Sequence, residues 1–334
     1  MNTVATEELA GWLDDGPGAA TSATASAYPG GATMQDPRHS RSRTDGANRD
    51  RYLGHDHADS PWNRAAAATA QYDPFCCRTE WALSFHESFA RHRALHLRAE
   101  GGSVLAFAER RERRLGPVLE PVESHWLCGC PLLGADAVEL LDAFLAEFDD
   151  SSRPRAVLVS GILPGSRLRR RLAAAFERRW QIFVLEPNHG RGASLDGGLD
   201  GFLSRRSGRL RRELRRQQRR AREHGVWFER AAPRSAAEAE SVYARMLAVE
   251  QKSWKGIGRC GMAEPPSRAF YAAMLGRLAA AGAGRVVFAR RGDDDVGFVL
   301  GGVCGSVYRG QQFSYDERWQ ALSIGNLLQV EQVR

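Results

Sequence analysis

The most chemically suggestive segment of the sequence lies near its C-terminal end, where an expected strand leads through a loop into an expected helix. This loop contains Ser323 and Gly325. Free backbone N–H groups at the start of a helix, with the positive end of the helix dipole, attract phosphate and pyrophosphate groups. Gly325 would let the backbone approach such a group closely. Ser323 can equally serve as a simple helix N-cap, so the loop alone allows both interpretations.

The elements that must position this loop form the second half of the chain, in the order β-α-α-β-β-β-α. Ser235 is expected to begin the first helix, because Glu238 follows three positions later, as in a capping box. Glycines and aspartates between the last three strands predict tight turns. The expected elements are a strand over 226–230, helices over 235–250 and 266–281, strands over 285–290, 296–303 and 307–315, and a helix over 322–333.

The first half predicts an α/β unit preceded by a polar arm. Residues 1–71 contain few large apolar groups, so they cannot bury enough surface to offset their ordering entropy, and we expect a disordered arm. Gly101 and Gly102 predict a hairpin. The other expected elements are helices over 79–91, 135–148 and 166–178, and strands over 94–99, 104–109, 126–130, 156–160 and 181–185.

Between the two halves, residues 201–224 predict one long and very basic helix that Gly225 ends. Ten arginines lie between Arg205 and Arg222, beside a narrow apolar stripe. Such a helix favours a solvated face or a strut between modules. Contact with an anionic glycan, a nucleotide sugar or a nucleic acid remains open, although no DNA- or RNA-binding motif accompanies the arginines.

The composition of the 334-residue chain excludes several classes of protein. Lys and Arg (47) exceed Asp and Glu (40), but 45 of the basic residues are Arg, which coding bias can explain. Both lysines, Lys252 and Lys255, lie in one short segment. No apolar run is long enough for a membrane span, and no secretory signal is present. Six cysteines without metal-ligand spacing predict neither a disulfide scaffold nor a zinc site, so we expect a cytoplasmic protein without a metal.

The order of elements and the C-terminal motifs resemble the GNAT acyltransferase superfamily, and more specifically its CelD/FemAB-like branch, over residues 72–334. That branch is similar to enzymes of polysaccharide or envelope modification. The motifs that carry the resemblance are Ser253-Trp254-Lys255-Gly256, Phe270-Tyr271, Tyr308-Arg309-Gly310, Phe313-Ser314-Tyr315-Asp316 and Leu322-Ser323-Ile324-Gly325.

The resemblance implies a mixed α/β fold of two tandem GNAT-like modules. Residues 72–200 would form a degenerate, catalytically silent first module, 201–225 a linker helix and 226–334 the acyl-CoA-binding module. The family's Gln/Arg-x-x-Gly-x-Gly/Ala loop holds the coenzyme A pyrophosphate. In this sequence the loop has Ser323 at the first Gly position. The implied cofactor-binding residues are Gln320, Ser323, Ile324, Gly325 and Asn326.

The mechanism that the resemblance implies is direct attack of an amine, or less often a hydroxyl, on the thioester of acetyl-CoA or another acyl-CoA. Glu250 and Asp316 are candidate bases, and Tyr308 or Tyr315 could protonate the leaving thiolate. Each has a simpler structural interpretation, because such Glu residues are usually solvated and strand Tyr residues usually pack. Trp254 and Lys255 are the candidate substrate-binding residues.

The sequence stops inside the helix that follows the fourth strand of this module. The resemblance therefore predicts a missing fifth strand, an incomplete cofactor cleft and an exposed, adhesive edge on the fourth strand.

The resemblance as a whole implies an acyl-CoA-dependent N-acyltransferase that acts on an amino sugar, a polysaccharide precursor or a similar amine. Two alternatives stay open. One is a FemAB-like transferase that uses aminoacyl-tRNA, the only case in which nucleic acid would be a partner. The other is a truncated remnant that only binds a glycan or a protein.

Overall fold

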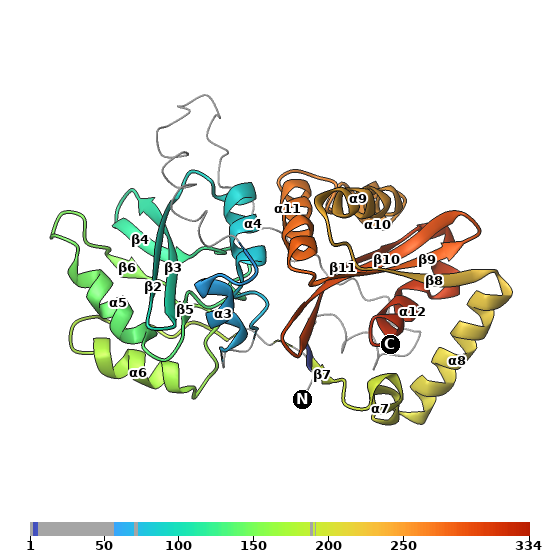
Figure 1. The fold of residues 1–334 in the computed structure, drawn as a ribbon, viewed down its shortest axis with the longest axis horizontal. Helices are drawn as coiled ribbons and strands as arrows, with labels where there is room; N and C mark the ends of the chain where they lie inside the picture. The colour runs from blue at the N-terminus through green and yellow to red at the C-terminus, as the bar shows by residue number, and fades with distance from the viewer. Residues whose placement is uncertain (1–2, 6–56, 70–72, 188–189, 191) are drawn as a thin grey trace.

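The computed structural model describes residues 3–5, 57–69, 73–187, 190 and 192–334. Two β-sheets, each covered by helices, make up two tandem α/β units along the chain (Figure 1). The predicted mixed α/β class is confirmed, and the order of the two units along the chain is consistent with the predicted tandem arrangement.

The first unit contains a five-stranded sheet with the order β2-β3-β4-β6, in which β5 also pairs with β3. Gly101 and Gly102 have positive φ angles and join β2 to β3, which confirms the predicted hairpin. The strands are β2 (Ala94–Glu100), β3 (Ser103–Glu112), β4 (Gly116–Pro121), β5 (Leu132–Leu133) and β6 (Ala156–Val157), and the helices are α3 (Pro61–Ala67), α4 (Thr79–Phe89), α5 (Ala137–Ala146) and α6 (Arg167–Phe176).

The second unit contains a six-stranded sheet with the order β7-β1-β11-β10-β9-β8, in which β8 to β11 form an antiparallel meander. Its strands are β1 (Thr3–Ala5), β7 (Gly192–Ser194), β8 (Val226–Ala231), β9 (Gly284–Arg291), β10 (Asp294–Cys304) and β11 (Val307–Tyr315). Its helices are α7 (Gly198–Ser204), α8 (Gly208–Glu223), α9 (Ala236–Glu250), α10 (Trp254–Ile257), α11 (Ser267–Ala280), the 3-10 helix η1 (Glu317–Leu322) and α12 (Ile324–Glu331).

Helices cover both faces of the second sheet, and one of them comes from the first unit. Helices α9 and α11 pack on one face, and α8, η1 and α12 pack on the other. Helix α4 lies against α11 (Figure 1). Its Trp81 and Phe85 are buried in the same apolar core as Phe270 and Met274. A shared core of this kind fixes the two units against each other.

Two strands predicted in the first unit are absent. Residues 126–130 form a loop because the carboxylate of Glu123 accepts hydrogen bonds from the backbone N–H groups of His125, Trp126, Leu127 and Cys128. A side chain thus replaces a neighbouring strand as the acceptor. Residues 181–185 pair with no strand in the described part of the chain, and their large apolar side chains are exposed.

The basic helix predicted over 201–224 is two helices, α7 and α8. Ser207 separates them because its hydroxyl accepts from the backbone N–H of Leu210 and caps α8. Gly225 follows α8 with a φ of 74°, as expected of a residue that ends a helix. The buried face of α8, formed by Leu214, Gln217 and Ala221, packs with α12 and η1. The helix therefore packs within the second unit and is not an isolated strut.

The arm predicted over residues 1–71 is too long at its C-terminal end. Helix α3 lies within the predicted arm. Ser60 caps this helix, and Trp62 is buried in the apolar core of the first unit. At the other end, β1 pairs in parallel with Val307 and Tyr308 and covers the start of the β11 edge that was expected to be open. Residues 1–2, 6–56 and 70–71 of the predicted arm lie outside the described residues.

Candidate functional site

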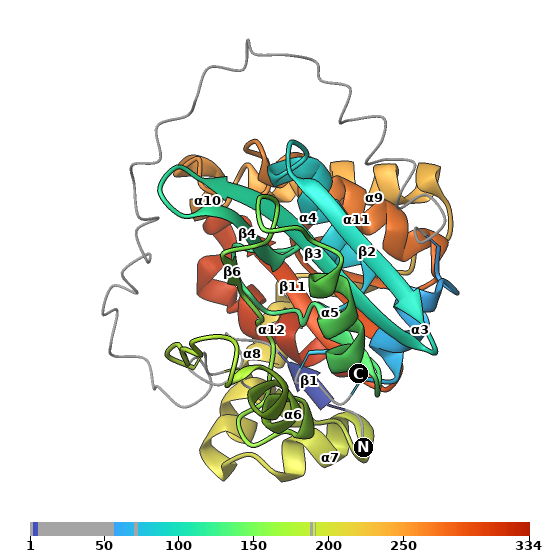
Figure 2. The same cartoon turned by 90° about the vertical axis from the view of Figure 1, so that its left-hand side faces the viewer.

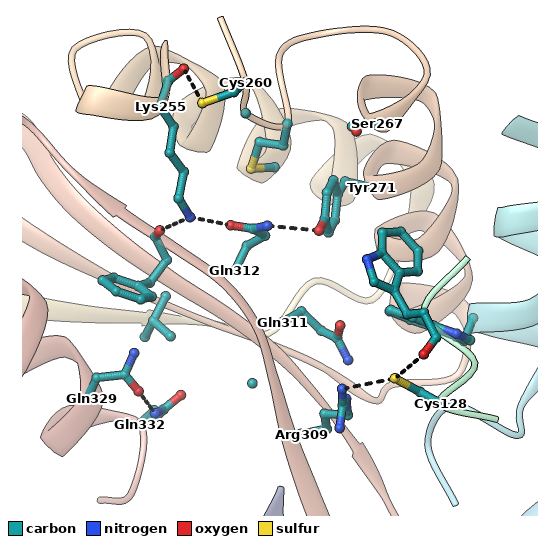
Figure 3. A pocket seen from close by; sticks show the side chains of 17 residues that line it. Cys128, Lys255, Cys260, Ser267, Tyr271, Arg309, Gln311, Gln312, Gln329 and Gln332 are labelled. Atoms are coloured by element: carbon teal, nitrogen blue, oxygen red, sulfur yellow. Dashed lines mark hydrogen bonds between the residues drawn. The ribbon is translucent and has the colours of Figure 1, made fainter. Parts of the chain in front are cut away.

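A cavity of about 260 Å³ lies between the two units, along β11 (Figure 3). The first unit contributes Trp81, Trp126 and Cys128 to its wall. The second unit contributes the middle of β11, Val299 of β10, Gln329 of α12, Gln332 just after α12, and the segment from α10 to α11. Residues from both units and from both faces of the second sheet thus meet at one place.

A β-bulge in β11 shapes the floor of this cavity. Leu300 pairs with Gln312 and Gly301 pairs with Gly310, so Gln311 is an extra residue in β11. A bulge turns side chains and backbone groups away from the regular ladder, and bulges are frequent next to active sites. The side chain of Gln311 accordingly extends into the cavity, where its Nε2 atom is buried and has no acceptor among the described residues (Figure 3).

A chain of three hydrogen-bonded side chains crosses the cavity wall. Lys255 Nζ donates to Gln312 Oε1 at 2.8 Å and to the carbonyl oxygen of Phe313 at 3.0 Å. Gln312 Nε2 in turn donates to the phenol oxygen of Tyr271 at 2.9 Å (Figure 3). Positive charge at Lys255 polarises the amide, and both bonds favour negative charge on the phenol oxygen. Such a phenol is a better proton donor than an isolated one.

A buried ion pair joins the units beside the cavity. The guanidinium of Arg309, on β11, pairs with the carboxylate of Asp73, just before α4. The side chains are 11% and 1% exposed. Arg309 Nη2 also lies 3.9 Å from the Cys128 thiol, a contact drawn in Figure 3. Arg309 thus forms an ion pair with a residue of the first unit and also lines the cavity.

The predicted phosphate loop lies at the start of α12, on the far side of β11 from α11. Ser323 has a φ of 56°, a left-handed conformation that glycine adopts without strain. Ser323, which stands at the first Gly position of the resembled pattern, therefore has a backbone conformation that glycine commonly adopts. A Cβ atom on Gly325 would lie 3.2 Å from the ring of Tyr315. Gly325 thus serves close packing, while the first turn of α12 still presents unpaired N–H groups.

The other predicted cofactor residues surround this turn in different ways. Ile324 is fully buried in the core between α8, α12 and the sheet, and Gln320 is exposed. Asn326 Nδ2 contacts Gln217 Oε1 of α8 at 3.5 Å. The structure therefore brings the basic helix close to the predicted phosphate loop.

The structure places three of the predicted catalytic residues outside the cavity lining. Asp316 caps η1 and binds Arg318 through both carboxylate oxygens, and these hydrogen bonds lower its pKa. Tyr308 donates to Gln332 Oε1 at 3.1 Å, and burial raises its pKa. Tyr315 packs on Gly325, and burial raises its pKa as well. Their catalytic roles stay predictions.

Glu250, the fourth candidate, lies directly behind the cavity wall. Its side chain is fully buried, and its Oε2 atom accepts from the backbone N–H of Ala263 at 3.1 Å. A Cβ atom on Gly261, which lines the cavity, would lie 2.6 Å from this oxygen. Burial raises the pKa of Glu250, although the charge of Lys255 and hydrogen bonds to the carboxylate oppose the shift. A carboxyl of this kind suits proton transfer nearer neutral pH.

We expect the buried carboxyl to make stability depend on pH. Because the folded pKa of Glu250 lies above its ordinary 4.5, the folded protein binds the proton more tightly. Its contribution to stability is complete below pH 4.5 and is lost as the pH rises through the folded pKa. Glu250→Gln should therefore remove a fall in the free energy of unfolding across this window, as measured by urea unfolding between pH 4 and 8. Parallel curves for the two proteins would contradict the assignment.

The predicted substrate-binding pair is divided by the structure. Lys255 lines the cavity, whereas Trp254 is 59% exposed on α10 and does not. The sequence analysis assigned no role to Tyr271, Arg309, Gln311 or Gln312. Three of these lie in the Tyr308–Tyr315 motif region, but neither the bulge nor the Gln312–Tyr271 bond is visible in a linear sequence.

Other chemistries have little support in the described part of the chain. No group of three or more His, Cys, Asp or Glu side chains there is arranged to hold a metal ion. All six cysteines are free thiols. Within the described ranges no helix is both long and apolar enough to cross a membrane.

Comparison with known proteins gives a family match for the C-terminal part of the chain and a likeness of fold to a solved structure. Residues 208–334, from the start of α8 onward, match the family model of the acetyltransferase (GNAT) domain. The fold is similar to the crystal structure of a conserved protein of unknown function from Bacteroides thetaiotaomicron VPI-5482. That likeness has a TM-score of 0.50 and 12% sequence identity, and it covers 86% of this chain and 84% of the other. No curated protein matches the sequence.

Proposed function

We propose that this chain, whose C-terminal part matches the GNAT acetyltransferase domain, transfers an acyl group from acyl-CoA to an amine. The observation that carries the proposal is the coincidence of that match with the cavity along β11. The cavity wall holds a strand bulge and a polarised phenol, and the first turn of α12 lies on the other side of β11, outside that wall. These are the groups that acyl transfer needs to hold a thioester and to stabilise the charge that develops on it.

The coenzyme would lie along β11 with its pyrophosphate at the first turn of α12. Backbone N–H groups of Ile324, Gly325 and Asn326 suit the phosphates. The thioester would then face the bulge at Gln311, where irregular pairing leaves backbone groups to stabilise the developing oxyanion. Acetyl-CoA is the simplest donor of this class.

Tyr271 is the residue best placed to protonate the leaving thiolate. It lines the cavity, and the Lys255–Gln312 chain supports negative charge on its oxygen. Neither Tyr308 nor Tyr315 lines the cavity. Glu250 is the better candidate base of the two carboxylates, because Asp316 is neutralised by Arg318 and its pKa is lowered. The acceptor amine would approach from the side of the first unit.

In the first candidate function, the acceptor is an amino sugar or a polysaccharide precursor. The reaction would take place in the cytoplasm, which supplies acyl-CoA.

One observation favours a second candidate function, transfer of an acyl group from aminoacyl-tRNA. Helix α8 contains eight arginines and two glutamates, and all eight arginines are exposed. Of these arginines only Arg216 has an ion-pair partner among the described residues. Phosphate binding by such a helix would be strongly salt-dependent. Titration of acetyl-CoA and of a charged tRNA separates the candidates, and a protein that binds neither is a non-catalytic remnant.

We expect Asn326→Asp to weaken acetyl-CoA binding by about tenfold or more, because it places a carboxylate where the pyrophosphate would lie. The same carboxylate is favourable at a helix N-terminus, so stability should not fall. Quenching of tryptophan fluorescence during acetyl-CoA titration measures the affinity. Gln251→Glu, an equal change of charge at an exposed site, is the control. Equal affinities for Asn326→Asp and Gln251→Glu would remove the loop from the cofactor site.

A further inference from the structure

The part of the cavity between β11 and the first unit is lined by hydrogen-bond donors. Gln311 Nε2 is buried without a partner among the described residues. The half-buried Trp126 lines the same cavity and supplies a second N–H donor, its indole. A buried donor without an acceptor is destabilising, so a Gln311 amide left this way at a cavity indicates a ligand that supplies acceptor atoms.

The charges around these donors have one sign. Lys255 and Arg309 line the cavity, and none of its lining residues is Asp, Glu or His. The acids that balance them, Asp73 and Glu250, are 2% and 0% exposed and lie behind the wall. A ligand therefore meets the cationic groups at shorter range than the carboxylates, and Coulomb energy falls with distance. This wall favours an anion over an ammonium group.

The donors of Gln311 and Arg309 lie apart from the first turn of α12, where the coenzyme phosphates would bind. Gln311 and Arg309 point toward Cys128 of the first unit, away from Lys255 and Tyr271 (Figure 3). The first turn of α12, where phosphates would bind, is not among the lining residues; Gln329 is the lining residue from α12, and Gln332 follows the end of the helix. The donors thus lie on the side from which an acceptor would approach the thioester.

We infer that Gln311, Trp126 and Arg309 bind an oxyanion, a carboxylate or a phosphate, that the acyl acceptor carries beside its amine. The inference rests on the proposed function only in identifying the ligand as the acyl acceptor. It gives the first unit a direct part in substrate recognition through Trp126. Neutral amines would lose both the charge and the acceptor atoms that these donors require.

The test compares two matched pairs of amines by isothermal titration calorimetry with the full chain. Glucosamine 6-phosphate against glucosamine reports on phosphate, and alanine against alaninamide reports on carboxylate. The anionic member of at least one pair should bind about tenfold more tightly, as expected for hydrogen bonds to a charged group. The pair that shows the preference identifies the source of the oxyanion.

Two glutamine variants locate the site. Gln311→Glu should abolish the preference for the anion, whereas Gln329→Glu, the same change on the α12 wall, should alter it less than about threefold. Gln311→Met keeps the size of the side chain and removes the donor, so it should weaken anion binding without reversing the preference. Urea unfolding of each variant shows that the fold is retained.

Several results would overturn the inference. These are equal affinities within both pairs, no binding of either anion, or equal effects of Gln311→Glu and Gln329→Glu. A loss of acetyl-CoA affinity in Gln311→Glu with an unchanged anion preference would assign the donors to the coenzyme arm instead. Wild-type protein that prefers the anions but does not bind acetyl-CoA would support this inference and reject the proposed function.

Discussion

Tyr271→Phe is expected to lower kcat by about a hundredfold while acetyl-CoA affinity changes less than about threefold. The phenol donates its proton only as the thiolate leaves, so its loss acts on the transition state and not on the bound substrate. Phenylalanine keeps the ring that packs on Phe270 at 5.0 Å. Steady-state kinetics with whichever of the four amines above reacts fastest measure kcat, and fluorescence titration measures the affinity for acetyl-CoA.

The leaving group makes this prediction specific. When the acyl donor is the thioester of an aryl thiol, the leaving thiolate is more stable and needs less protonation. The loss of kcat caused by Tyr271→Phe should therefore be smaller with such a donor than with acetyl-CoA. Lys255→Met should cause a smaller loss with the same dependence, because it removes the charge that polarises Gln312. Ser267→Ala, which removes another hydroxyl of the cavity wall, is the control. An equal defect with both donors would reduce Tyr271 to a packing role.

Asp73→Asn is expected to lower the free energy of unfolding by about 3–5 kcal/mol, because it leaves the charge of Arg309 buried without its partner. Such a loss is a large fraction of the usual stability of a folded protein. In the wild-type protein Asp73 Oδ1 accepts a hydrogen bond from the backbone N–H of Cys76 at 3.1 Å. Asparagine keeps an oxygen that can accept the same bond. Urea unfolding followed by circular dichroism measures the change.

The double variant Asp73→Asn/Arg309→Met separates an unpaired charge from a lost attraction. It should recover a substantial part of the stability, since no charge remains buried. It should not recover anion binding, since Arg309 lines the cavity. Glu147→Gln breaks an exposed pair with Arg98 and should cost less than about 1 kcal/mol. A double variant as unstable as Asp73→Asn would show that Arg309 is held by contacts other than this pair.

Elements with a local cause could be predicted from the sequence. Ser235 caps α9 through the N–H of Glu238, as its spacing indicated, and the Gly101-Gly102 turn joins β2 to β3. The loss of the strand predicted over 126–130 also has a local cause, whereas the pairing of β1 with Val307 and Tyr308 of β11 joins opposite ends of the described chain and has a distant one. Glu123 supplies the acceptors that a strand would have supplied to residues 125–128, and a single carboxylate cannot be recognised as such from spacing alone.

The candidate site shows the same division between local and distant causes. Lys255 and the Ser323–Gly325 loop could be identified because their signals, a rare lysine and a strand–loop–helix junction, lie in short segments. Tyr271 and Gln312 are 41 positions apart and are joined by one hydrogen bond. No periodicity predicts that bond.

By itself the sequence determined the order of the main helices and strands from β8 to α12, several helix caps and turns, and the superfamily that the C-terminal half resembles, because these depend on residues close together in the chain. Only the tertiary structure decided which groups surround the cavity. Helix α4 is built into the core of the second unit, and Asp73 meets Arg309 across the boundary. The bulge at Gln311 depends on how β10 and β11 pair. Contacts of this kind depend on the packing of whole units, which is a property of the folded chain.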